Sequence, residues 1–195
     1  MPKHWAKGMV GGILATLYLT FFMFGSMFGG TAQASEFVPP RNGMSLNLGY
    51  LYDPGENIAL SQLCFIRLYD YDDVWPHQAP EPLRFKVEVS LGPSRLENGD
   101  VRVNAGAGIF ALYYLDGFAS AWGRPYVEAG IGVTYTDYRV EEQGLRFNFN
   151  PQAGAGMEFD ENNFASLRLH HVSNGGLDDD NRGMNAILVV LGRYF

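Results

Sequence analysis

The residues best suited to chemistry lie near the carboxyl end of the chain, in the stretch ASLRLHHVSNGGL. If this stretch is a β-strand, successive side chains alternate between two faces, and His171 and Ser173 share a face with Leu167 and Leu169. Two residues of strand span about 6.6 Å, a gap that an imidazole bent along the strand can cover. The pattern therefore indicates a general base beside a hydroxyl nucleophile, both on an apolar face.

A third polar residue falls on the corresponding face of the next segment. Asn185 alternates with apolar residues, and a hairpin that pairs residue 171 with residue 185 leaves a connecting loop of 174–182. Polar side chains at lipid depth are costly and tend to be functional. The alternative is that the strand ends by residue 170 and that the polar residues belong to a hydrated loop.

The first 34 residues have the features of an export signal. Lys3 and Lys7 precede a long apolar run, and the sequence TAQAS then offers a small-residue cleavage site after Ala34. We expect residues 1–34 to be a cleaved signal peptide and residues 35–195 to form a single β-barrel domain. The alternative is a transmembrane anchor, because the apolar run is long enough to span a bilayer.

The composition of the mature segment excludes some classes of function. Without Lys3 and Lys7 the chain keeps 12 of its 14 basic residues against 21 acidic ones, a formal net charge of −9. Such an acidic exported chain is not expected to bind nucleic acid. Cys64 is the only cysteine, which excludes an intrachain disulfide and a metal site built on two cysteines.

Alternating segments rich in glycine and aromatic residues fill the rest of the chain. Most are 9–15 residues long, longer than the ~5–6 of soluble strands and close to the ~9–11 that cross a bilayer at a tilt. Eight such segments predict an all-β fold, an eight-stranded antiparallel transmembrane β-barrel of the outer membrane. The predicted strands are 43–52, 57–70, 83–91, 101–115, 124–137, 145–159, 163–173 and 184–195.

The alternation within these segments fits a barrel that is surrounded by lipid. One face of 101–115 carries only apolar side chains, and Asn148 and Asn150 alternate with Phe147 and Phe149. The polar sets suit a packed, hydrogen-bonded interior and the apolar sets suit lipid. A soluble, lipocalin-like barrel with the apolar sets inside is the alternative.

The ends of the predicted strands indicate how the barrel is oriented. With both chain ends at the periplasmic side, we expect the loop 174–183 to be extracellular and 71–82 to be a periplasmic turn. His171 and Ser173 then lie near the outer-leaflet boundary, so we expect their substrate to be a lipid. The aromatic residues near strand ends, typical of interfacial girdles, are Tyr50, Tyr52, Tyr69, Tyr71, Trp75, Tyr113, Tyr114, Trp122, Tyr126, Tyr135 and Tyr138.

The segment HVSNGGL, followed by NRGMN, resembles the signature of the lipid A 3-O-deacylase (PagL) family, H-x-S-N-[AG]-G-L and then N-x-G-x-[EN]. Members of that family are eight-stranded outer-membrane barrels that hydrolyse the ester of the 3-hydroxyacyl chain at the 3 position of lipid A. The resemblance implies lipid A, the anchor of lipopolysaccharide, as substrate, with Ser173 as nucleophile and His171 as base. It implies no cofactor and no metal. The matching residues are His171, Ser173, Asn174, Gly175, Gly176, Leu177, Asn181, Gly183 and Asn185.

Asn185 departs from the best-described family pattern, which has Glu at this position. An Asn carbonyl can accept the imidazole Nδ1–H and fix the tautomer, but it cannot neutralise the imidazolium that forms during attack. This would slow the chemical step, but a carboxylate that faces lipid carries a desolvation cost of its own, so the sequence leaves the efficiency with Asn185 open. Candidate donors to the oxyanion are the backbone amides of Asn174, Gly175 and Gly176 and the side chain of Asn181.

Two further functions stay open at this point. One is a non-catalytic outer-membrane barrel with a structural or adhesive role, and the other is an acyltransferase barrel that modifies lipid A. The acidic run 178–180 either holds a divalent cation that bridges lipid phosphates or is a solvated loop tip. The sequence also leaves open whether two copies form a homodimer.

Overall fold

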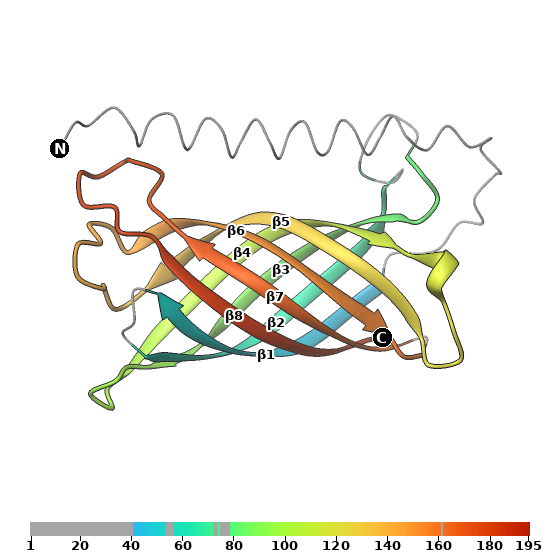
Figure 1. Ribbon diagram of the computed structural model, residues 1–195, viewed down its shortest axis with the longest axis horizontal. Helices are drawn as coiled ribbons and strands as arrows, with labels where there is room; N and C mark the ends of the chain where they lie inside the picture. The colour runs from blue at the N-terminus through green and yellow to red at the C-terminus, as the bar shows by residue number, and fades with distance from the viewer. Residues whose placement is uncertain (1–40, 54–56, 72–73, 75–78, 161) are drawn as a thin grey trace.

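The computed structural model describes residues 41–195 except 54–56, 72–73, 75–78 and 161. Eight antiparallel strands form a closed barrel in which each strand pairs with the next and β8 pairs with β1 (Figure 1). The strands are β1 (Arg41–Asp53), β2 (Ile58–Asp70), β3 (Leu83–Arg95), β4 (Val101–Tyr114), β5 (Arg124–Thr136), β6 (Phe147–Glu158), β7 (Asn163–Val172) and β8 (Met184–Tyr194), with the short helix η2 (Asp116–Phe118) before β5.

Some expectations fall on residues outside this description. The predicted signal peptide, 1–34, lies outside the described residues, as do Trp75 and half of the predicted turn 71–82. Among the described residues, no helix is long and apolar enough to cross a membrane.

The prediction of eight strands is confirmed, with ends within two residues of those expected at every strand except β3. β3 continues to Arg95 through Gly92 and Pro93, beyond the predicted end at residue 91. Pairing with β4 runs through this point, whereas the ladder to β2 is interrupted there, and proline cannot donate to a ladder. A Cβ on Gly92 would lie 1.9 Å from the Ser61 carbonyl oxygen, so only glycine permits this approach of the strands.

The outer surface of the barrel is apolar, as the alternation predicted. In β2 the outward Leu63 and Phe65 are 55% and 60% exposed, while the inward Cys64 and Ile66 are buried. The same alternation of exposed and buried residues is seen in the other strands. A soluble barrel would expose this band to water, so the band disfavours the lipocalin-like alternative and suits a lipid environment.

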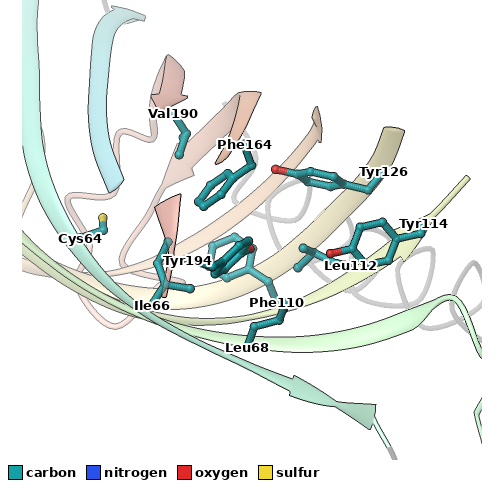
Figure 2. Packing of buried hydrophobic residues seen from close by; sticks show 10 residues of the cluster. All are labelled: Cys64, Ile66, Leu68, Phe110, Leu112, Tyr114, Tyr126, Phe164, Val190 and Tyr194. Carbon is teal, nitrogen blue, oxygen red and sulfur yellow. The ribbon is translucent and has the colours of Figure 1, made fainter. Parts of the chain in front are cut away.

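The interior is less uniformly polar than the sequence indicated. A cluster of buried apolar side chains fills part of the lumen (Figure 2), and its aromatic pairs include Tyr114 with Tyr126 and Phe164 with Tyr194. Tyr114, Tyr126, Tyr71 and Tyr138 were assigned to the interfacial girdles, and for these four the assignment is wrong because their side chains are buried. The ten residues of the cluster are Cys64, Ile66, Leu68, Phe110, Leu112, Tyr114, Tyr126, Phe164, Val190 and Tyr194.

Four charged side chains meet inside the barrel and form what we call the inner charge cluster: Lys86, Glu88, Glu128 and Arg168. The Arg168 guanidinium donates to both carboxylate oxygens of Glu88 at 2.7 Å and to Glu128 Oε1 at 2.6 Å. The Lys86 ammonium lies 2.9 Å from Glu88 Oε1 and 2.6 Å from Glu128 Oε2. Two cations thus meet two carboxylates, and the cluster joins β3, β5 and β7 across the lumen.

Replacing Arg168 with Met should destabilise the barrel, because two buried carboxylates then face a single cation. We expect a loss of about 3–5 kcal/mol in the free energy of unfolding, measured by denaturant-induced unfolding of the protein in lipid vesicles. Arg146→Met is the matched control, since Arg146 forms an exposed ion pair with Asp137 at 2.8 Å, and it should change little. Equal unfolding midpoints for the two variants would contradict a special contribution from the inner charge cluster.

Candidate active site

The pairing of β7 with β8 brings His171 and Asn185 directly opposite each other. This register is the one that the sequence predicted, and it is confirmed. His170 points inward and is 7% exposed, whereas His171 is exposed on the outer face. The two adjacent histidines therefore lie on opposite sides of the barrel wall, as strand alternation requires.

Ser173 lies one residue beyond β7 but keeps the geometry of the strand. Its backbone exchanges two hydrogen bonds with Phe149 of β6, at 2.8 and 3.0 Å, in the same register as the rest of the β6–β7 ladder. The alternative in which the strand ends by residue 170 is therefore wrong. Because the strand geometry continues, Ser173 stays on the outer face with His171.

The imidazole of His171 is held from two sides. Its Nδ1 lies 2.7 Å from Asn185 Oδ1, and because a carbonyl oxygen can only accept, the proton of the neutral ring is on Nδ1. This tautomer leaves a lone pair on Nε2. Gly183 packs beside the ring, and a Cβ at this position would lie 2.8 Å from His171 Cε1.

Asn185 has a second partner, Asp53, which the sequence did not predict. Its Nδ2 donates to Asp53 Oδ2 at 2.7 Å, across the seam between β8 and β1. A carboxylate only accepts hydrogen bonds, so this contact directs the amide nitrogen to Asp53 and the amide oxygen to His171. No local sequence pattern marks Asp53, because it is 132 residues from Asn185 along the chain.

The Ser173 hydroxyl is held by the loop that follows it. It donates to Asn181 Oδ1 at 3.2 Å and accepts from the Gly175 amide at 3.1 Å. The Asn174 amide also donates to Asn181 Oδ1, at 2.8 Å, which fixes the orientation of the Asn181 side chain. In this state the hydroxyl proton is directed to Asn181. Among the residues that the structure describes, Ser173 and His171 share the outer face but make no hydrogen bond with each other.

The four candidate oxyanion donors are not equivalent in the structure. The Gly175 amide donates to Ser173 Oγ, and the Asn181 side chain accepts from that hydroxyl. The Asn174 amide donates to Asn181 Oδ1, and the Gly176 amide donates to Asn174 Oδ1, each at 2.8 Å. Gly175 and Gly176 have φ values of +69° and +83°, a backbone that favours glycine and turns the chain back. Within the described residues, Asn181 Nδ2 makes no hydrogen bond and can serve as a donor.

The loop that carries Asn181 is braced by its neighbour, the connection between β5 and β6. The Gly144 amide donates to the Asp180 carbonyl at 2.7 Å, and the Arg182 amide donates to the Glu142 carbonyl at 3.0 Å. Figure 1 shows these two loops together at one end of the barrel. The buried Asn174 adds a further tie, because its Nδ2 donates to the Asp180 carbonyl at 2.9 Å.

The acidic run 178–180 shows no arrangement of metal ligands. Within the described part of the chain, no three His, Cys, Asp or Glu side chains group as ligands for a metal ion. Asp178 Oδ1 accepts instead from the Asp180 amide at 3.0 Å, which closes a local turn.

The surface beside Ser173 is apolar and open. Phe149 packs next to Gly175. The ring centroids of Tyr135 and Phe147 lie 5.0 Å apart on the same side of the wall. Leu169, on β7 and on the same face as Ser173, is 58% exposed. A cavity of about 210 Å³ lies at the opposite end of the barrel, where Arg41 and Tyr114 line it. The arrangement at Ser173 thus suits a hydrolytic site that meets an apolar substrate on the outer wall.

Comparisons with known proteins agree with this geometry. The sequence model of the family described as "Lipid A 3-O-deacylase (PagL)" matches residues 69–193. "Lipid A deacylase PagL" of Pseudomonas aeruginosa is 34% identical over 93 residues, which cover 46% of this chain and 54% of that protein, so the match spans about half of the relative's length. The crystal structure of "the outer membrane enzyme PagL" superposes with a TM-score of 0.55 at 25% identity, covering 77% of this chain and 97% of that one.

The contact between Gly183 and the imidazole gives a test of the site that needs no knowledge of the substrate. Gly183→Ala should displace the His171 ring and slow the labelling of Ser173 by a fluorophosphonate by about 10–100-fold, measured as labelled protein against time. Gly117→Ala is the matched control, because a Cβ there meets nothing within 4 Å. Unchanged labelling in the Gly183 variant would mean that His171 does not activate Ser173 from this position.

Proposed function

Because the chain belongs to the lipid A 3-O-deacylase (PagL) family, we propose that it hydrolyses the ester of the 3-hydroxyacyl chain at the 3 position of lipid A. The observation that supports this most directly is the hydrogen bond between His171 Nδ1 and Asn185 Oδ1, on the outer face that also carries Ser173. A base with a fixed tautomer beside a serine on the lipid-facing wall is the arrangement that ester hydrolysis of a lipid requires.

The protein is an outer-membrane β-barrel of a Gram-negative-type bacterium. We further propose that residues 1–34 direct export and are removed, and that residues 35–195 are the single mature domain. Lipid A lies in the outer leaflet of that membrane as the anchor of lipopolysaccharide. Its acyl chains would lie along the apolar wall beside Leu169 and Phe149, with its sugars at the level of the loop that carries Asn181.

The proposed reaction begins with the Ser173 hydroxyl. Nε2 of His171 takes the hydroxyl proton as Oγ attacks the ester carbonyl, and the Gly175 amide and Asn181 Nδ2 stabilise the oxyanion. The tetrahedral intermediate then breaks the bond to the sugar oxygen, which receives the proton from His171. An acyl-enzyme on Ser173 remains.

Water completes the cycle. His171 accepts a proton from the water that attacks the acyl-enzyme, and the proton returns to Oγ as the 3-hydroxy fatty acid leaves. Asn185 keeps the imidazole in the required tautomer throughout both halves. Neither a cofactor nor a metal takes part, and all the residues of the proposed site come from one chain, so a homodimer is not required.

Two alternative functions predict a different effect on lipid A. An acyltransferase would pass an acyl group to lipid A and raise its mass, whereas a structural or adhesive barrel would leave lipid A unchanged. The deacylase should lower its mass by one 3-hydroxyacyl chain.

Side-by-side substitution of the adjacent histidines tests the proposal. His171→Ala and Ser173→Ala should each lower release of the 3-hydroxy fatty acid by at least ~10³-fold, and the double variant should be no worse, because the two groups act as a unit. His170→Ala should keep substantial activity in folded protein, since this side chain points inward. Mass spectrometry of lipid A measures release, and heat-dependent gel migration verifies folding.

The opposite result, an inactive His170 variant with an active His171 variant, would contradict a catalytic site on the outer wall. Lipid A of increased mass would favour the acyltransferase, and unchanged lipid A from the wild-type protein would favour the structural barrel.

The proposed export signal has its own test. Mass spectrometry of the protein from outer-membrane fractions should find Ser35 as the first residue, because small residues at 32 and 34 suit a signal peptidase. A chain that keeps its first 34 residues would support the transmembrane anchor instead.

A further inference from the structure

Asp53 reaches the proposed active site through an irregularity at the end of β1. β1 pairs with β8 in one register up to Leu51 and Ala186, and the register shifts before Asp53 and Asn185. Without that shift, Asp53 would share the inward face of Leu51, which is buried. A bulge re-aims the side chain that follows it, and here it sets Asp53 beside the outward Asn185.

The contact forms a continuous chain of hydrogen bonds. Asp53 Oδ2 accepts from Asn185 Nδ2 at 2.7 Å, and Asn185 Oδ1 lies 2.7 Å from His171 Nδ1. The donor and the acceptor of each hydrogen bond are fixed, because a carboxylate cannot donate and the amide nitrogen cannot accept. Figure 1 shows β1 lying along β8, so barrel closure itself brings the carboxylate to this seam.

This chain of hydrogen bonds supplies the negative charge that the neutral Asn185 side chain lacks. A neutral amide fixes the tautomer of His171 but contributes no charge when the ring becomes an imidazolium. A carboxylate one hydrogen bond further away polarises the amide and puts a negative charge on the same side of the ring. The amide of Asn185 and the carboxylate of Asp53 together can therefore do the work of one carboxylate at position 185.

We propose, on the premise of the function above, that Asp53 is a positioning residue for the deacylation, acting on His171 through Asn185. Its carboxylate locks the orientation of the amide and favours the charged ring that forms during attack. The competing explanation is that Asp53 only closes the seam between β1 and β8. The two explanations predict different effects of removing Asp53 on kcat and on the tautomer of His171. They also predict different responses when a carboxylate is placed at position 185 instead.

Kinetics with lipopolysaccharide in detergent micelles distinguish them first. Asp53→Ala should lower kcat by about 10–100-fold with KM nearly unchanged, because the residue touches His171 only through Asn185. Asp53→Asn should lose less, since its carbonyl can still accept from Asn185. Asp137→Asn is the matched control, an exposed aspartate at the same end of the barrel that pairs with Arg146, and it should match wild type.

The tautomer gives a readout that a purely structural contact would not alter. In protein labelled with ¹⁵N-histidine, wild-type His171 should show a proton on Nδ1 only, assigned by comparison with His171→Ala. Asp53→Ala frees the Asn185 amide to rotate, so the ring should show a mixture of the two tautomers.

Moving the carboxylate provides the rescue. In the Asp53→Ala background, Asn185→Glu should restore kcat to within a few-fold of wild type, because the carboxylate then contacts Nδ1 directly. In the wild-type background the same change places two carboxylates in contact and should give no gain. If Asp53→Ala has wild-type kcat and an unchanged tautomer, or if Asn185→Glu fails to rescue it, Asp53 is a seam contact only.

The outcome also separates this inference from the proposed function. Wild-type protein that releases no 3-hydroxy fatty acid overturns the deacylase itself. An active wild type with an equally active Asp53→Ala variant overturns only the role of Asp53.

Discussion

The inward direction of the Arg168 guanidinium is the constraint on which the outer site depends. Side chains alternate strictly along β7, so an inward Arg168 requires an inward His170 and an outward His171. A slip of one residue would move a guanidinium into lipid and leave the carboxylates of Glu88 and Glu128 buried against a single cation. An ion cluster in the lumen therefore determines which histidine meets the membrane.

Closure of the barrel assembles the site from segments far apart in the chain. β7 supplies His171 and the strand geometry that continues to Ser173, and β8 supplies Asn185. The first strand reaches the last one only because the sheet closes, and the bulge after Leu51 then turns Asp53 to the outer face. The connection between β5 and β6 braces the loop that holds Asn181. A site on the wall of a barrel thus draws on neighbours on both sides of its central strand.

The polar groups at this boundary satisfy one another. Polar side chains near lipid are costly unless they are hydrogen-bonded, and here His171, Asn185 and Asp53 form one chain while Ser173 and Asn181 form another. The apolar residues around them remain available to acyl chains. An open face on the barrel suits a substrate that arrives by lateral diffusion in the membrane and never enters the lumen.

The sequence by itself determined the eight strands and the shared face of His171, Ser173 and Asn185. Both follow from a period of two residues, which is a local property of the chain. Only the tertiary structure decided that Tyr114 and Tyr126 fill the lumen, that β3 continues through Pro93, and that Gly176 turns away from Ser173. It also decided the contact of Asp53 with Asn185, because a bulge and the closure of the sheet depend on pairings between residues far apart in the chain.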